Sequence, residues 1–223
     1  MARATTHRKN GRSSFVVVLA LLILVAAGGV AFFLFRNDTT SNAQEHPPGS
    51  PTITVPSSVA APTINFRLKQ VTPTSIGNPG SKTDEASQKA ANDVTDALAQ
   101  FYEQAFLTKD NWSQADYAAA WASVVEESRA AAQRDVDLLT LGKDAPSTYS
   151  SVSFDNGDVS VQVLLDENAQ PKSAIASVHF SAEASQKDGG TTAVRSVGRY
   201  FLRPEGDKWM IYGYQVRRKD KQA

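Results

Sequence analysis

A row of arginines is the feature of this sequence whose residue type and spacing best suit the binding of a charged group. Arg195, Arg199 and Arg203 recur at every fourth position of a predicted strand, so their side chains share one face with Val197 and Phe201. A guanidinium group presents a planar pair of N–H donors that matches a carboxylate. The row therefore predicts a contact with an anion or a partner, or ion pairs with acids on the same outer sheet face.

His179 is the one histidine in the predicted folded part, since His7 and His46 precede it. In its strand Val178 and Phe180 lie on the apolar face and His179 lies on the polar face, where we expect it to be solvated or in an interface. A general base is the alternative interpretation. The chain has no cysteine, and a single histidine without cysteine speaks against a zinc site.

Four aromatic residues are the candidates for lining a ligand pocket: Tyr102, Tyr117, Trp121 and Tyr200. Aromatic side chains at these spacings also fill cores, so packing is the competing interpretation. The paired acids of the helical region lie on polar helix faces and indicate solvated surface. Without a glycine-rich phosphate loop, a nucleophile elbow or metal-ligand spacing, the sequence predicts no catalytic residue, no metal and no cofactor.

Charge is unevenly distributed, although Lys and Arg balance Asp and Glu at 23 each over the whole chain. Residues 1–14 contain four basic residues and no acid, whereas residues 82–223 contain 16 basic and 21 acidic residues. A nucleic-acid binder needs a basic surface that displaces counterions from phosphates. The acidic balance of the larger part therefore predicts no nucleic-acid partner.

The stretch Phe15–Phe35 predicts a membrane span. Its 21 residues carry no charge, and a helix of that length rises about 30 Å, the thickness of the hydrocarbon core. Because the basic tail at 1–14 precedes it, we expect a single-pass protein of the plasma membrane with a cytoplasmic N-terminus and an extracytoplasmic remainder. A signal peptide cleaved near Ser41–Ala43 is the alternative.

Residues 36–81 are predicted to be a linker, because they hold seven of the ten prolines together with many Ser and Thr residues. Within them, "TINFRLK" alternates Ile64, Phe66 and Leu68 with polar residues, which is typical of a strand. Three interpretations of this piece remain open at this stage: an edge strand of the domain, no regular structure, or a peptide that docks on a partner's sheet.

The part from 82 to 223 is predicted to be one α+β domain, with N-terminal helices packed on a strongly bent antiparallel sheet. Apolar residues at helical spacing predict a long helix over 83–107 and one or two helices between 113 and 142. From residue 148 the period changes to two. The strands are predicted at 149–154, 159–165, 173–184, 191–203 and 208–217, with a tight turn at Asn156-Gly157 and another around Pro204 and Gly206.

Residues of about 83–217 resemble the nuclear transport factor 2-like (cystatin-like α+β cone) superfamily. The resemblance is carried by "FYEQAF" at Phe101–Phe106 in the first helix and by "GDKWMIYGYQV", in which a Trp begins the last strand. It implies that the helices cover the concave sheet face around a conical pocket and that the convex face often forms a dimer. Alternation in the last strand then puts Tyr212 and Tyr214, with Val216, on the face opposite Trp209.

These observations predict a membrane-anchored extracytoplasmic protein-interaction module, without enzymatic activity, that contacts the lipid bilayer through Phe15–Phe35. A homodimer or an envelope partner would bind residues Arg195, Arg199, Arg203, Tyr212 and Tyr214. The design is similar to single-span subunits of type IV secretion machines and to accessory proteins of actinobacterial lipid-import systems. Alternatives are a binder of a small apolar ligand or an isomerase- or cyclase-like enzyme that uses the cone pocket, and a span that is itself the functional part.

Overall fold

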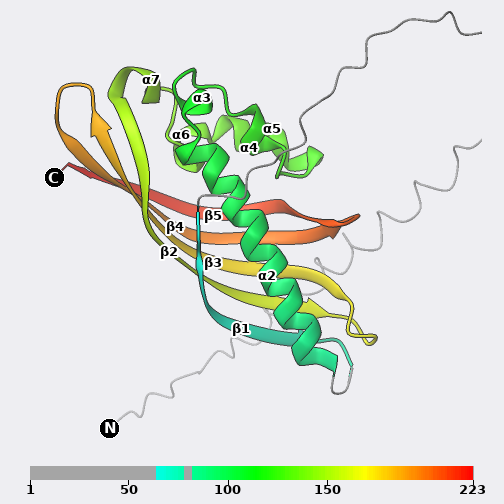
Figure 1. The fold of residues 1–223 in the computed structure, drawn as a ribbon. Coiled ribbons are helices and arrows are strands. Elements are labelled where there is room, and N and C mark those ends of the chain that lie inside the picture. Colours follow the sequence, from blue (N-terminus) through cyan, green and yellow to red (C-terminus); the bar gives the residue numbers. More distant parts are fainter. Residues whose placement is uncertain (1–63, 78–81, 223) are drawn as a thin grey trace, which may run out of the picture. The chain divides into compact units, whose positions relative to one another are not determined.

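The computed structural model describes residues 64–77 and 82–222 (Figure 1). The predicted basic tail, the span at 15–35 and most of the 36–81 linker lie outside these residues. Among the described residues, no helix has both the length and the apolar character needed to cross a bilayer. The span therefore stays a prediction from the sequence.

Five strands form one sheet in chain order. They are β1 Arg67–Ser75, β2 Tyr149–Leu165, β3 Pro171–Gln186, β4 Thr191–Glu205 and β5 Lys208–Gln222. Strands β2 to β5 pair antiparallel as predicted, but β1 pairs parallel to β2. The sheet is thus mixed rather than antiparallel, because the helices between β1 and β2 return the chain to the end of the sheet where β1 starts.

Strand β1 comes from the segment that was predicted to be linker. Ile64 and Phe66, just before it, are 3% and 6% exposed and belong to the hydrophobic core. The edge-strand interpretation of "TINFRLK" is therefore correct for this structure. The folded part includes Ile64, well before the predicted boundary at residue 82.

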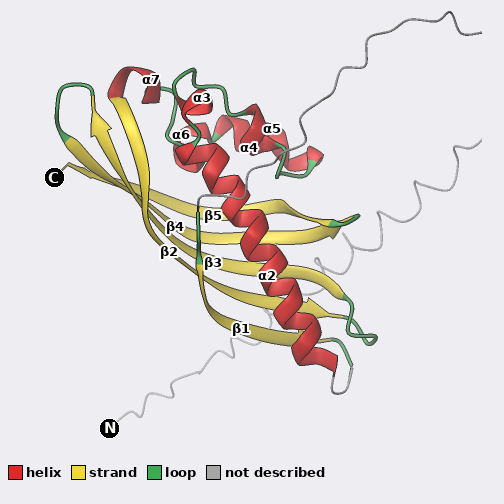
Figure 2. Ribbon diagram, in the orientation of Figure 1, coloured by secondary structure: helices red, strands yellow, loops and turns green. Residues whose placement is uncertain are grey.

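One long helix crosses the sheet, as predicted for 83–107. Helix α2 spans Thr83–Tyr102 and continues into the π-helical turn η2 at Glu103–Leu107. Figures 1 and 2 show α2 lying diagonally over one face of the bent sheet, with the shorter helices gathered toward one end. The fold is α+β, and its arrangement is consistent with a cone.

The second helical region is more broken than predicted. The short helices are α3 Lys109–Trp112, α4 Ala118–Trp121, α5 Glu126–Arg134, α6 Val136–Leu139 and α7 Ala145–Thr148. Between α4 and α5 the chain is extended, and the backbone of Ile211 in β5 bonds to Ser123 and Val125 at 2.9 and 3.0 Å. This bridge interrupts the helical region. It also gives the backbone N–H and C=O of Ile211, at the edge of the sheet, hydrogen-bond partners.

A predicted turn is absent from β2. Asn156-Gly157 was expected to form a tight hairpin, but β2 runs without a break from Tyr149 to Leu165 and pairs with β3 along its length. Gly157 instead lies beneath Phe66: a Cβ atom at this position would be 2.5 Å from two carbons of the ring. The glycine is needed for close approach of a side chain, not for a turn.

The last hairpin also differs in detail from the prediction. Pro204 lies in β4 opposite Trp209, so the turn consists of Gly206 and Asp207, with Gly206 at φ +62°. The register shifts between Phe201 and Leu202, which leaves Tyr212 as an extra residue in β5. The predicted facing of β5 is therefore wrong beyond the bulge, because the extra residue reverses the alternation.

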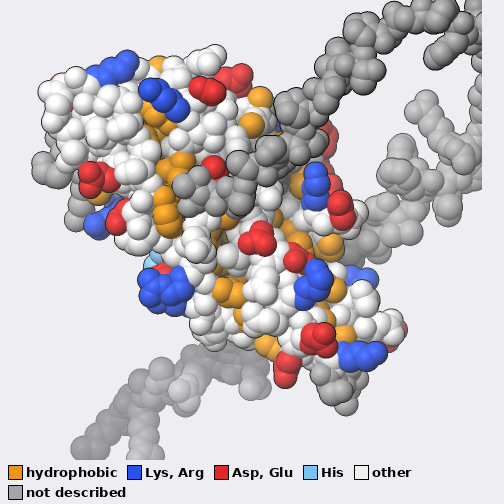
Figure 3. All heavy atoms as spheres, viewed as in Figure 1, with side chains coloured by type: hydrophobic (Ala, Val, Ile, Leu, Met, Phe, Trp, Pro, Cys, Tyr) orange, Lys and Arg blue, Asp and Glu red, His pale blue; other side chains and the backbone are white. Residues whose placement is uncertain are grey.

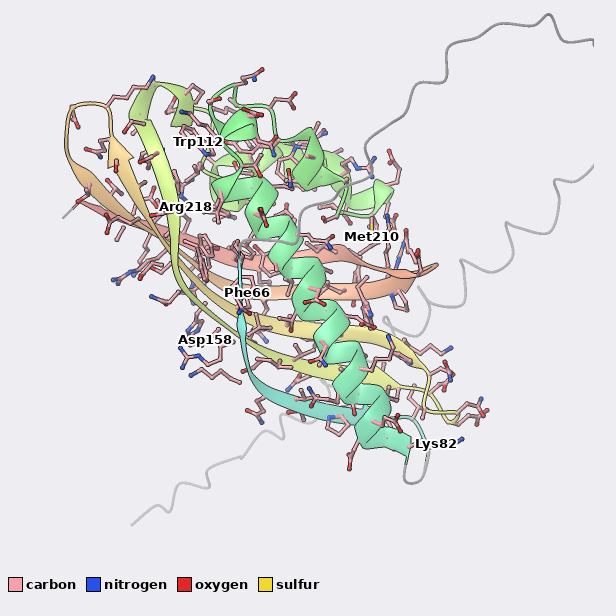
Figure 4. All side chains as sticks on the ribbon, viewed as in Figure 1. Phe66, Lys82, Trp112, Asp158, Met210 and Arg218 are labelled. Carbon is pink, nitrogen blue, oxygen red and sulfur yellow. The ribbon has the colours of Figure 1, made fainter. Side chains whose placement is uncertain are left out.

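Aromatic side chains fill the space between α2 and the sheet. The ring of Tyr102 lies 4.7 Å from Phe180, 5.3 Å from Phe106 and 5.4 Å from Phe66, measured between centroids. Figure 4 labels Phe66 at the start of β1, beside α2. These contacts make the space between α2 and the sheet a packed core.

Candidate functional site

The face of the sheet that α2 does not cross carries a cluster of basic side chains. In β4, Val194, Ser196 and Tyr200 are buried, while Arg195 and Arg199 point the other way and are exposed. This alternation places the predicted arginine row on the outer face, as expected. Figure 3 shows the opposite, helix-bearing face, where acidic and basic side chains are interspersed.

Strand register defines what surrounds Val197, which is 44% exposed. Arg195 pairs with Lys219, and Val197 pairs with Arg217. We call the four basic residues around Val197 the outer basic patch: Arg195, Arg199, Arg217 and Lys219. Arg217 and Lys219 were not among the predicted site residues, because unbroken alternation from Trp209 puts them on the helix-facing side, and the bulge at Tyr212 turns them outward.

The outer basic patch is not neutralised by the domain itself. Within residues 64–77 and 82–222, none of its four side chains forms an ion pair with a carboxylate. Residues 191–222 contain eight basic and three acidic residues, so this end of the sheet is positive although the domain is acidic overall. Unpaired cations around an exposed apolar side chain are available to an acidic partner.

Two predicted partner-binding residues are already engaged within the domain. Arg203 bonds to Glu127 at 2.7 Å and to Glu205 at 2.6 Å. The contact with Glu205 is the largest cause of a raised pKa of its guanidinium, and the contact with Glu127 raises this pKa further. The Tyr214 hydroxyl donates to Asp135 at 2.7 Å. Burial is the largest cause of the raised pKa of Tyr214, and the hydrogen bond to Asp135 raises this pKa further. Both residues therefore hold helices to the sheet.

The bulge in β5 explains the position of Tyr214. Beyond Tyr212 the alternation shifts by one residue, so Tyr214 and the buried Val216 face the helices together with Trp209. Tyr212 is partly buried, and its ring centroid lies 6.2 Å from that of Phe201. Of the two predicted tyrosines, only Tyr212 stays near the outer face.

The four predicted pocket aromatics are all core residues. Tyr102, Tyr117, Trp121 and Tyr200 are 0%, 2%, 6% and 1% exposed. The Tyr200 hydroxyl donates to that of Tyr102 at 3.1 Å, and the Tyr102 hydroxyl lies 3.0 Å from Ser196 Oγ. Burial raises the pKa of Tyr102 to about 12 and that of Tyr200 well above its ordinary value. These hydroxyls satisfy one another inside the core.

His179 has the position expected from the alternation, exposed on the outer face opposite Asp158 in β2. Asp158 lies 3.3 Å from Arg67 Nε and 3.6 Å from Lys69 Nζ of β1, and these are ion pairs without hydrogen-bond geometry. Figure 4 labels Asp158 beside β1. Within the described residues, no cluster of His, Asp and Glu could hold a metal ion.

A pocket of about 570 Å³ lies where α6 and α7 meet the ends of β2 and β5. Arg218 lines it, but its guanidinium is bonded to Asp220 at 2.6 and 3.0 Å and to the carbonyls of Asp137 and Thr140. Figure 4 shows Arg218 on β5. Arg218 was not among the predicted site residues, because the bulge that turns it toward the helices is not visible in the sequence.

No family model, curated protein or solved structure matches this chain. The outer basic patch is the site that this geometry supports best, since the predicted pocket aromatics are packed and Arg218 is bonded within the domain.

Proposed function

We propose that this protein is a membrane-anchored extracytoplasmic module that binds an acidic protein partner through the outer basic patch. The uncharged stretch Phe15–Phe35 and the basic residues before it support the anchor and its orientation. The proline-rich residues that follow support a tether between the anchor and the folded domain. We expect the partner to belong to the cell envelope, because the proposed orientation of the anchor puts the domain outside the cytoplasm.

The observation that carries this proposal is the set of unpaired cations around Val197. Arg195 and Arg199 are exposed on a sheet face that α2 leaves uncovered, and neither pairs with a carboxylate of the described residues. Arg203, on the same strand, does have acidic partners. Arginine at an interface can bind a carboxylate with two parallel hydrogen bonds, which gives orientation as well as affinity.

Charge favours a different protein over a second copy as the partner. A two-fold dimer through this face would bring the same basic residues together, and like charges in contact oppose association. Residues 82–137 contain 11 acids and five bases, so two copies are complementary only head to tail. A head-to-tail contact does not close a dimer by itself.

The alternative function, a small apolar ligand bound in the cone, has less support. It requires free volume beside Tyr102 and Tyr200, but both side chains are buried against neighbouring rings. An isomerase- or cyclase-like enzyme would also need a polar acid or base within that volume. The hydroxyls found there are bonded to one another.

Zero-length carbodiimide coupling in intact producing cells tests the proposal, because it joins the Lys219 amine to a partner's carboxylate. The wild-type chain should yield one reproducible cross-linked species. Reversing the charge of Arg195 and Arg199 to Glu should remove it, whereas Arg134→Glu, an exposed arginine on α5, should not. A species that survives the double reversal, or is lost equally in Arg134→Glu, would contradict the proposal.

A further inference from the structure

A polar groove crosses four strands on the outer face of the sheet. It has a volume of about 250 Å³ and is lined by side chains of β1, β2, β3 and β4: Gln70, Thr72, Ser160, Gln162, Ile175, Ser177 and Arg199. The strand register explains why these residues meet. Gln70, Ser160, Ser177 and Arg199 are successive cross-strand neighbours, so they form one straight row perpendicular to the strands.

A second row lies beside the first. Thr72 pairs with Gln162, and Gln162 pairs with Ile175. With strands about 4.8 Å apart, a row across four strands extends over roughly 14 Å, the length of a small extended ligand. The groove thus has neutral amides and hydroxyls along most of its length, a guanidinium at one end and the partly buried Ile175 as an apolar surface.

The polar side chains of the groove have little bonding within the protein. Gln70 Nε2 donates to Thr72 Oγ1 at 3.3 Å. Among the described residues, the side chains of Ser160, Gln162, Ser177 and Arg199 have no hydrogen-bond or ion-pair partner, and no carboxylate lines the groove. Their donors and acceptors are therefore available to a ligand.

We propose that this groove binds a sugar unit that carries an anionic group, a carboxylate or a phosphate. Amide and hydroxyl side chains both donate and accept hydrogen bonds, as sugar hydroxyls do. Arg199 would hold the anionic group with its fork of N–H donors, and Ile175 would contact a C–H face of the ring. The site shares Arg199 with the outer basic patch but does not require a protein partner.

Calorimetric titration of the full chain in detergent micelles tests the groove with four probes: glucuronic acid, glucose 6-phosphate, glucose and inorganic phosphate. At least one anionic sugar should bind saturably at millimolar concentration and about tenfold more tightly than glucose or inorganic phosphate. Whether the carboxylate or the phosphate probe binds more tightly identifies the anionic group.

Matched variants separate the groove from general charge attraction. Arg199→Gln should weaken binding of the anionic sugar about tenfold. Arg195→Gln makes the same change on the same strand face outside the groove and should alter affinity by less than about twofold. Ser177→Leu, which fills the groove and keeps the charge, should abolish binding. Circular dichroism of each variant checks that the fold is kept.

Several results would overturn this inference. One is the absence of saturable binding for both anionic sugars. Another is equal weakening by Arg195→Gln and Arg199→Gln, which would indicate diffuse charge attraction. Inorganic phosphate that binds as tightly as glucose 6-phosphate would exclude contacts to the sugar hydroxyls. Saturable binding of an oligoglutamate peptide in place of the sugars would make the groove a peptide site.

Discussion

Gly157 of β2 lies directly against the ring of Phe66, so closely that a Cβ atom at residue 157 would be 2.5 Å from two ring carbons. Phe66 in turn contacts the rings of Tyr102, Phe154 and Phe180, with centroids 5.4 to 6.4 Å apart. The residues that lead into β1 thus pack into the core, and the absence of a side chain at a glycine about 90 positions further along the chain leaves room for the Phe66 ring. This relationship joins a segment of the predicted linker to the domain.

Gly157→Ala should destabilise the protein by about 1–3 kcal/mol, because the added methyl group forces the Phe66 ring out of its position. Urea unfolding followed by tryptophan fluorescence measures the change. Phe66→Ala alone should cost about 3–5 kcal/mol. In the Phe66→Ala background, Gly157→Ala should cost much less, since the clash is gone. An unchanged cost in that background would show that the glycine serves another purpose.

Tyr102→Phe should cost more stability than Tyr200→Phe. The Tyr102 hydroxyl lies between the other two hydroxyls of the buried trio, so its removal takes a partner from both Ser196 and Tyr200. A buried group left without its partner costs about 1–3 kcal/mol. Tyr200→Phe leaves the contact between Tyr102 and Ser196 in place. Urea midpoints of the two variants give the order, and the reverse order would contradict the bonding described.

Stability should fall at alkaline pH. Burial raises the pKa of both Tyr102 and Tyr117 to about 12, above the ordinary tyrosine value of 10.0. The folded state therefore favours the protonated, neutral form. This contribution is present in full below about pH 10 and is lost as the pH rises from about 10 through 12. Urea unfolding over this range should show a smaller decline in Tyr117→Phe than in the wild type, and equal declines would contradict the shift.

Arginines of one strand should differ in their effect on stability. Arg203→Gln removes contacts with Glu127 and Glu205, but these are partly exposed, so the cost should be under about 1 kcal/mol. Arg195→Gln and Arg199→Gln remove no ion pair of the described residues and should change stability by less than about 0.5 kcal/mol. Thermal unfolding of the three variants makes the comparison. A large cost at Arg195 or Arg199 would mean a structural role.

Much of the fold could be predicted from the sequence, because periodicity reports which side of an element is buried. The helix over 83–107 and the four antiparallel strands follow this rule. The prediction of a turn at Asn156-Gly157 was wrong, although this dipeptide is typical of a turn. The contact that decides the structure here comes from Phe66, which is far away in the sequence. The parallel pairing of β1 likewise depends on a distant strand.

The site could be predicted in part. Alternation in β4 correctly placed Arg195 and Arg199 on the outer face. The same rule failed for Tyr214, because the bulge at Tyr212 shifts the facing of the rest of β5. The engagement of Arg203 by Glu127 could not be predicted either, since it requires the segment before α5 to reach the edge of β5.

Photocrosslinking from residue 197 is a direct test of whether the outer basic patch binds an acidic envelope protein. A photoreactive amino acid replaces Val197, at the centre of the outer basic patch, in the full chain within its producing cells. We expect one dominant adduct with an acidic envelope protein, and this adduct should be lost when Arg195 and Arg199 are both changed to Glu. The same amino acid at exposed Gln114, before α4, is the control and should not give that adduct. No adduct from residue 197, or the same adducts from both positions, would show that the outer basic patch does not bind this partner.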